Sequence, residues 1–141
     1  MRRKRRKAFT IVEVLVVIIL LGMIATLIVP KMFKGLEEQK RKIAKAQIAN
    51  IEGAIERFYI ECGRYPMESE QFEVLLVAPS DLEEGKWKGP YLKRSQLVDP
   101  WDQPYIYREE GEYNLGGYDI ICYGADKVEG GEGDNADVVN D

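Results

Sequence analysis

The chain has 141 residues, a length that fits about one domain and argues against a two-domain enzyme. Its formal net charge of −4 is unevenly distributed, because six of the 20 Lys and Arg residues lie between Arg2 and Lys7 and all 24 Asp and Glu residues come later, so the chain after residue 8 carries −10. This acidic body lacks the basic surface that binds nucleic acid, and the absence of His argues against hydrolytic or proton-shuttling chemistry.

A long apolar segment follows the basic residues directly. Residues 9–29 are apolar except for Thr10, Glu13 and Thr26, and as a helix they reach roughly 30 Å, the thickness of a bilayer's hydrocarbon core. The preceding basic cluster predicts a cytoplasmic N-terminus and a C-terminal body across the membrane. The segment is too long for an ordinary secretory signal and reaches Pro30 without a small-residue cleavage site, so an uncleaved anchor is one interpretation.

Glu13 is the acidic residue inside this apolar segment. A carboxylate in such a helix costs about 2.5–3.5 kcal/mol on insertion scales, so it is normally paired or functional. One interpretation is that Glu13 extends its carboxylate to the cytoplasmic headgroups, since it lies near the start of the span. The other is that a cation from elsewhere pairs with it.

The residues around Glu13 carry a family resemblance. With the basic leader before it and Pro30 after it, the segment Lys7-Ala8-Phe9-Thr10-Ile11-Val12-Glu13 resembles the class III leader of type IV pilins and type II secretion pseudopilins. The resemblance implies that a prepilin peptidase cuts between Ala8 and Phe9 on the cytoplasmic side and methylates the new amine. Ala8 stands where the family usually has Gly, and Ile11-Val12 where it has Leu-Ile.

The same resemblance implies a role for the span in assembly. The resemblance implies that the new α-amine of one subunit meets the Glu of a neighbouring subunit, and it makes Glu13 and Pro30 the predicted assembly residues. Cleavage would also remove the six basic residues of the leader. A buried ion pair holds its register only when both members are present, because an unpaired charge is strongly penalised.

The pattern changes after Pro30, which should kink or locally open the helix at the end of the span. Residues 31–62 predict an amphipathic helix that ends near Gly63, with Pro66 just beyond. Within it, residues 34–45 have few apolar positions and predict an exposed stem that pairs with neighbouring stems. The apolar stripe recurs at three- and four-residue spacing and comprises Ala44, Ile48, Ile51, Ile55, Phe58 and Tyr59.

The remaining residues predict a small α+β body. Ser69 followed by Glu70 to Val77 reads as a short N-capped helix that Pro79 ends. Residues 104–108 and 118–122 read as two antiparallel strands joined by a glycine-containing turn. The fold class is therefore α+β, with a long N-terminal helix packed on a small antiparallel sheet. The aromatic residues that pack in this core are predicted to be Tyr65, Tyr91, Trp101, Tyr105 and Tyr107.

Short motifs along the body extend the resemblance over nearly the whole chain. They are Gly63-Arg64-Tyr65-Pro66, Glu70-Gln71, Asp99-Pro100-Trp101 with Pro104-Tyr105, Tyr123-Gly124-Ala125-Asp126 and Asn135-Ala136-Asp137. In this order they follow the pattern of the major pseudopilin of type II secretion, which has a type IV pilin-like fold. The resemblance implies a leader at 1–8, a transmembrane and assembly helix at 9–30, a stem helix at 31–62 and a body at 63–141.

The resemblance also implies the function and the partners. The chain is expected to be a structural subunit that polymerises with itself through its N-terminal helix and drives export of folded proteins. Expected partners are minor pseudopilins, inner-membrane secretion assembly proteins, prepilin peptidase and the inner membrane itself, with the body periplasmic; no nucleic acid is expected. The alternatives are a type IV pilin for adhesion, motility or DNA uptake, a transmembrane receptor anchor, and a membrane-tethered enzyme, for which no nucleophile–base pair is evident.

The acidic, glycine-rich tail predicts a second site. Residues 124–141 offer carboxylates and carbonyls to Ca²⁺, which takes 6 to 8 oxygen ligands, although the spacing does not fit an EF-hand and such a tail can also be solvated and disordered. Major pseudopilins bind one structural Ca²⁺ in this loop. The resemblance implies Asp126 and Asp134 as side-chain ligands and the carbonyls of Tyr123, Val128 and Gly131, with Asp137 and Asn135 in reserve.

Cys62 and Cys122 are the only two cysteines of the chain. A disulfide between them is chemically allowed outside the cytoplasm. Two separate buried thiols are the other possibility, because the sequence does not show whether the two Cα atoms lie within roughly 7 Å.

Overall fold

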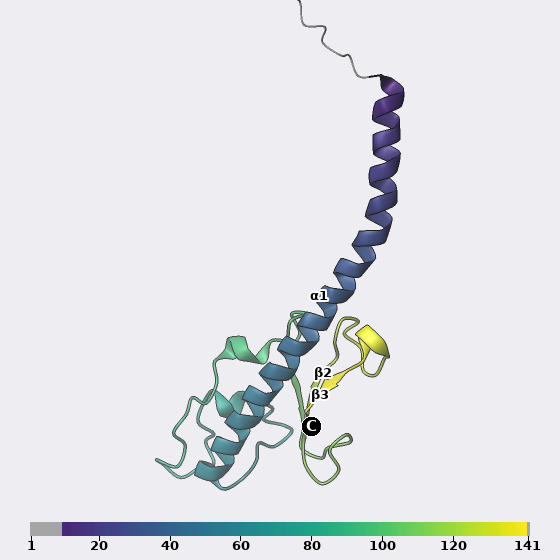
Figure 1. Ribbon diagram of the computed structural model, residues 1–141. Coiled ribbons are helices and arrows are strands. Elements are labelled where there is room, and N and C mark those ends of the chain that lie inside the picture. The colour runs from purple at the N-terminus through teal and green to yellow at the C-terminus, as the bar shows by residue number, and fades with distance from the viewer. Residues whose placement is uncertain (1–9, 141) are drawn as a thin grey trace, which may run out of the picture. The chain divides into compact units, whose positions relative to one another are not determined.

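The computed structural model describes residues 10–140, without the side chains of residues 30–34 and 134. Helix α1 spans Ile11–Cys62, and the chain divides into two compact units between Leu36 and Glu37. The predicted leader and the cleavage site at Ala8 and Phe9 lie outside the described residues. The α+β fold class is confirmed, because one long helix precedes a small antiparallel sheet (Figure 1).

Helix α1 is continuous through Pro30, so the predicted local opening of the helix is not observed. Proline removes one hydrogen bond from the ladder, and the many remaining bonds of this long helix continue on both sides. The helix ends at Cys62, as the Gly63-Pro66 pattern predicts. Gly63 adopts φ 77°, and its N–H donates to the carbonyl of Tyr59 at 2.8 Å, a left-handed cap that favours glycine.

The second half of α1 buries its apolar stripe in the body. Six of its residues are at most 2% exposed, and they recur every three or four positions: Ala44, Ile48, Ile51, Ala54, Ile55 and Phe58. Tyr59 was predicted to share this stripe but is 42% exposed and stacks on Tyr65, with ring centroids 4.4 Å apart. The reason is geometric, since a residue next to Phe58 is rotated by about 100° around the helix.

The start of this second half is less exposed than the predicted free stem. Trp101 of the body donates its indole N–H to the Glu37 carboxylate at 2.8 Å, and the Lys40 ammonium lies 5.7 Å from the centre of the same ring. Ala44 is fully buried. The body therefore covers one face of residues 37–45, and only the other face, with Lys42 and Ile43, is exposed.

The described residues contain one three-stranded antiparallel sheet in the order β1-β2-β3. Strands β1 (Ile106–Arg108) and β2 (Asp119–Cys122) lie within the two predicted segments, with Tyr107 opposite Ile120. The sequence did not reveal β3 (Val138–Val139), a two-residue strand near the C-terminal end of the sequence that pairs Val138 with Cys122. Of the predicted core aromatics, Trp101, Tyr105 and Tyr107 are buried, Tyr91 is half-buried, and Tyr65 is 39% exposed.

The predicted helix at 69–77 is wrong. Only a short 3₁₀ helix forms there, at Glu73–Leu75, and no side chain caps its start. Gln71 adopts φ 49°, and its side-chain amide accepts the N–H of Tyr107 at 3.1 Å and donates to the carbonyl of Tyr107 at 3.0 Å. The amide thus occupies the outer edge of β1 as a neighbouring strand would, and the turn that directs it there replaces the helix.

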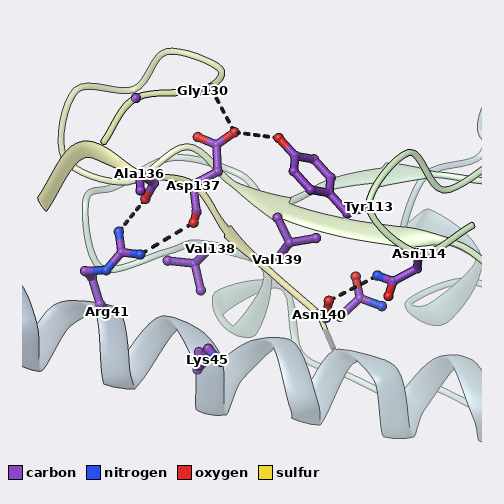
Figure 2. Close-up of a pocket in the computed structure, with 11 residues that line it drawn as sticks. Arg41, Lys45, Tyr113, Asn114, Gly130, Ala136, Asp137, Val138, Val139 and Asn140 are labelled. Carbon is purple, nitrogen blue, oxygen red and sulfur yellow. Dashed lines mark hydrogen bonds between the residues drawn. The ribbon is translucent and has the colours of Figure 1, made fainter. Parts of the chain in front are cut away.

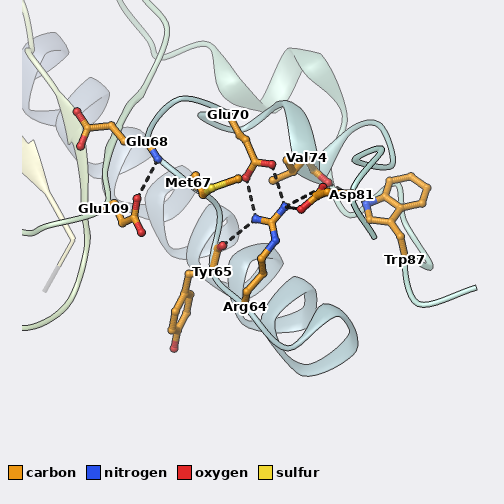
Figure 3. Close-up of polar contacts among 9 residues, drawn as sticks. All are labelled: Arg64, Tyr65, Met67, Glu68, Glu70, Val74, Asp81, Trp87 and Glu109. Carbon is orange, nitrogen blue, oxygen red and sulfur yellow. Dashed lines mark hydrogen bonds and ion pairs between the residues drawn. The ribbon is translucent and has the colours of Figure 1, made fainter. Parts of the chain in front are cut away.

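An ion-pair network fixes the segment before Gln71. The Arg64 guanidinium donates two 2.8 Å hydrogen bonds to the Glu70 carboxylate and a further one of 3.1 Å to Asp81 (Figure 3). Glu70 also accepts the N–H of Met67 at 2.9 Å, and the guanidinium lowers the pKa of Glu70. Two-pronged Arg–carboxylate pairs are among the stronger hydrogen bonds of proteins, so Arg64 and Glu70 hold this segment firmly.

Asp119 is a fully buried carboxylate that organises the connection between β1 and β2. It accepts the N–H groups of Glu112, Tyr113 and Asn114 at 2.7–3.0 Å, as well as the side-chain amide of Asn114. Burial alone would raise the pKa of Asp119, but these donors outweigh burial and lower it. One charged side chain therefore satisfies three backbone donors of the turn at 109–118.

We predict that Asp119→Ala lowers the free energy of unfolding by about 3 kcal/mol, because it leaves three backbone N–H groups without a partner. Because the pKa of Asp119 is lowered on folding, its contribution is present above the unfolded pKa of about 3.9 and is lost as the pH falls through the folded value. Denaturant unfolding at pH 7 and at lower pH measures both effects. Glu110→Ala, an exposed change in the same turn, is the control and should change stability little; equal losses in both variants would contradict the prediction.

Candidate functional site

The first candidate site is the start of α1. The Glu13 N–H donates to the Thr10 hydroxyl at 3.2 Å, and the Val14 N–H donates to the Thr10 carbonyl at 3.2 Å. Thr10 is therefore the helix cap, and Glu13 lies in the first turn, where the helix dipole favours a negative charge. The Thr-x-x-Glu spacing, which signals a capped helix start, was present in the sequence but was not used above.

The Glu13 carboxylate is exposed and contacts no cation among residues 10–140. It belongs to the candidate membrane span Ile11–Val29, none of which is buried within the protein. The large apolar side chains of this span are 47–87% exposed. Lipid or other copies of the chain must therefore cover this surface. The same cover would enclose Glu13. The side chain of Pro30, the other predicted assembly residue, lies outside the described residues.

The second candidate site is the tail loop, residues 124–137. Positive φ values recur at Gly124, Lys127, Gly130, Gly131 and Gly133, so the chain turns repeatedly within a short distance. A Cβ at Gly131 would approach the carbonyl oxygen of Asn135 to 2.5 Å, so the absence of a side chain lets the loop close on itself. The loop is therefore tightly turned, and backbone carbonyls of such a loop are among the ligands that Ca²⁺ accepts.

The predicted ligands differ in their surroundings. Asp126 is exposed and accepts the N–H of Val128 at 3.2 Å, and the Val128 side chain is itself 62% exposed. Tyr123 is half-buried, and the Asp134 side chain lies outside the described residues. Among the side chains that the structure describes, no group of three acidic, Cys or His residues is arranged to hold a metal. A site here would therefore combine single carboxylates with carbonyl oxygens of the loop.

Asp137, named above only as a reserve ligand, is the best-placed carboxylate of the loop. Its Oδ2 accepts the Gly130 N–H at 2.9 Å and lies 3.5 Å from the Tyr113 hydroxyl (Figure 2). Its Oδ1 is buried and has no hydrogen-bond partner in the described part of the chain. A buried, unpartnered carboxylate oxygen is costly, and a hard cation would satisfy it, so the oxygen donors of this loop fit Ca²⁺.

An ion pair connects the loop to the sheet. Arg108 at the end of β1 donates to the Glu129 carboxylate at 2.6 Å and to Glu112 at 3.0 Å, and the hydrogen bond with Glu129 raises the pKa of Arg108. Glu129 is therefore occupied by Arg108, so it is not expected to serve as a further metal ligand.

The two cysteines are both buried and are not joined in the structure. The Cys122 thiol donates to the buried Asp99 carboxylate at 3.0 Å, and burial, together with this hydrogen bond, raises the pKa of the thiol to about 12. The other oxygen of Asp99 accepts the N–H groups of Trp101 and Gln103, both at 2.8 Å. Cys122 is thus an inert thiol that helps to fix the Asp-Pro-Trp turn.

Comparison with known proteins decides the family. The family described as "Type II secretion system (T2SS), protein G" matches residues 31–141, and the "Prokaryotic N-terminal methylation motif" matches residues 3–29. The chain belongs to the type II secretion system protein G family. The predicted resemblance to the type II secretion pseudopilin is confirmed, and with it a structural role in the secretion system and a membrane anchor at the N-terminus. The type IV pilin alternative is not favoured by these matches.

Individual relatives agree with this assignment. Type II secretion system core protein G of Pseudomonas aeruginosa is 34% identical over 142 residues, which cover 99% of this chain and 98% of the relative. The protein of the same name from Vibrio cholerae is 32% identical over 140 residues, covering 99% and 94%. The crystal structure of the major pseudopilin of enterohaemorrhagic Escherichia coli is 20% identical, with a TM-score of 0.63 over 79% of this chain and 94% of that one, and shares the fold.

Proposed function

We propose that the chain polymerises into the type II secretion pseudopilus and that growth of this polymer pushes folded proteins outward. The observation that supports this most strongly is the family match over residues 31–141 together with the methylation motif over residues 3–29. The structure adds an apolar helical span, Ile11–Val29, that no other part of the described chain buries, as a polymerising helix requires. The body is proposed to lie on the periplasmic side of the inner membrane, opposite the basic leader.

The proposed route to the polymer begins with processing. Prepilin peptidase cuts between Ala8 and Phe9, which removes the basic leader and leaves an α-amine at Phe9. Glu13, in the capped first turn of α1, then accepts the amine of a neighbouring copy. Both charges are costly in an apolar environment unless they meet, so the pair sets the register between copies. Minor pseudopilins and inner-membrane assembly proteins are the proposed further partners.

Processing can be tested on protein isolated from membranes of cells that contain prepilin peptidase. We predict an N-terminal residue of Phe9 carrying a methyl group, found by N-terminal sequencing and intact mass. Ala8→Gly restores the residue usual at this position and should be cut at least as fully. Material that still begins with Met1 would show that the chain is a simple tether and not a processed pseudopilin.

Removal of the charge at Glu13 should separate insertion from assembly. We predict that Glu13→Gln keeps the protein in the membrane fraction, since the span becomes more apolar, but reduces polymer by more than tenfold because the amine loses its partner. The yield of filaments sheared from cells measures the polymer. Crosslinking between copies with a reagent that does not react with cysteine measures it independently. Glu38→Gln, an exposed carboxylate of α1 outside the span, is the matched control. Normal filaments from Glu13→Gln would refute the role of the pair.

We further propose that the tail loop holds one structural Ca²⁺. Asp126 and Asp134 would supply carboxylates, the carbonyls of Tyr123, Val128 and Gly131 further oxygens, and Asp137 its unpartnered Oδ1. When bound, the ion would neutralise part of the acidic body and hold the loop closed. The support comes from the buried, unpartnered oxygen of Asp137 and from the glycines that let the loop turn tightly.

We predict that EDTA lowers the melting temperature of the detergent-solubilised protein by about 5–15 °C, because an ion that binds only the folded state stabilises it by mass action. Addition of Ca²⁺, but not of Mg²⁺, should restore the original value, because Mg²⁺ demands a tighter octahedral site. Asp126→Asn should abolish the difference, whereas Glu132→Gln in the same loop should preserve it. A melting temperature that is the same with EDTA and with Ca²⁺ would remove the calcium proposal.

A further inference from the structure

One side chain of α1 connects the helix to the end of the tail loop. Arg41, half-buried on the helix, donates from its two terminal nitrogens to the carbonyl of Ala136 and, at 3.5 Å, to the carbonyl of Asp137 (Figure 2). These carbonyls lie 95 and 96 positions later in the chain. They immediately precede β3, so Arg41 contacts the loop where the chain leaves it for the sheet.

An open cavity lies beside the contact between Arg41 and the loop end. It has a volume of about 540 Å³ and lies between this part of α1 and the loop, and its lining includes Arg41, Gly131 and Asn140. Figure 2 shows the guanidinium reaching up from the helix to the loop end. Val138, in β3, is the first buried residue beyond the contact. Directed hydrogen bonds from Arg41 thus hold the loop end to the helix just before the chain enters the core at Val138.

Asp137 takes part both in the contact with Arg41 and in the hydrogen bonding inside the loop. Its carbonyl accepts Arg41, while its carboxylate accepts the N–H of Gly130 and leaves Oδ1 buried without a partner in the described residues. Docking of the loop end on the helix thus also positions the carboxylate oxygen that is free to take a cation. We propose that Arg41 is a positioning residue that holds residues 136–137 in the geometry in which the loop binds Ca²⁺, so that calcium binding and loop docking are coupled.

The inference rests on the calcium site proposed above. The direction in which calcium affinity changes when Arg41 is removed distinguishes positioning from simple charge repulsion. As a bare positive charge, Arg41 would repel Ca²⁺, so its removal would strengthen calcium binding. As a positioning residue, it raises the fraction of loops that are already docked, and the apparent dissociation constant varies inversely with that fraction. Because the guanidinium donors are directed at carbonyl groups, the positioning effect should dominate.

Calcium titration of the full-length, detergent-solubilised protein by calorimetry tests the proposal. We predict that Arg41→Ala weakens the apparent calcium affinity by about tenfold. Arg41→Lys keeps the charge but not the two-pronged donor, so it should weaken binding too, by a smaller factor. Lys42→Ala removes the same charge from the next position, whose side chain is 72% exposed and bonds to Glu38, so it should bind Ca²⁺ as the wild type does.

A second measurement separates coupling from a general loss of stability. A purely structural Arg41 would lower the melting temperature equally with EDTA and with Ca²⁺, whereas coupling also shrinks the shift that Ca²⁺ produces. By reciprocity, Ca²⁺ should slow amide hydrogen exchange at Val138 and Val139 in the wild type, and less so in Arg41→Ala. If Arg41→Ala fails to fold, Arg41→Lys carries the comparison.

The outcomes keep the two proposals apart. If the wild type binds Ca²⁺ and Arg41→Ala binds it equally or more tightly, the positioning role is wrong and the calcium site stands. If the wild type itself binds no Ca²⁺, both are wrong. A weakened affinity with a smaller calcium-dependent shift, seen in Arg41→Ala and not in Lys42→Ala, supports the coupling.

Discussion

The apolar first half of α1 has no cover within the chain, and this constraint underlies the rest of the structure. The large side chains from Ile11 to Val29 are at least 47% exposed, and no part of the span is buried. Such a surface is stable only in lipid or against other helices of the same kind. A protein with this helix has to remain in the membrane or enter an assembly, and a secretion pseudopilin exchanges the first environment for the second.

The second half of the same helix supplies the core of the body, which contains little regular structure of its own. The described sheet has strands of only three, four and two residues. Side chains complete the hydrogen bonding that longer elements would provide. Gln71 hydrogen-bonds along the edge of β1. Asp119 accepts three backbone N–H groups of the turn at 109–118, and Asp99 accepts two in and after the Asp-Pro-Trp turn. The buried stripe of α1 then supplies the common core.

This division explains how far the sequence could predict the structure. The helix, its apolar stripe and its glycine cap follow from periodic spacing over many residues, a signal that survives in a single chain. The segment at 69–77 was mistaken for a helix because local propensity cannot reveal that Gln71 is held by Tyr107, which lies 36 residues later. β3 escaped notice for a similar reason, since two residues have no period and only pairing with Cys122 defines them. Arg41 looked like one more exposed charge because its acceptors are backbone carbonyls, which leave no mark in a sequence.

The contacts of the tail link the small sheet to helix α1. The last strand of the tail is too short to be stable alone, so the position of residues 136–139 depends on β2 on one side and on Arg41 of α1 on the other. Arg108 attaches the middle of the loop to β1 through Glu129. The loop is thus fastened at its end to the helix that also forms the membrane span, and an ion bound inside it would stabilise this fastening. If Ca²⁺ binds as proposed, order in this acidic segment and order at the start of the stem are parts of one folding equilibrium.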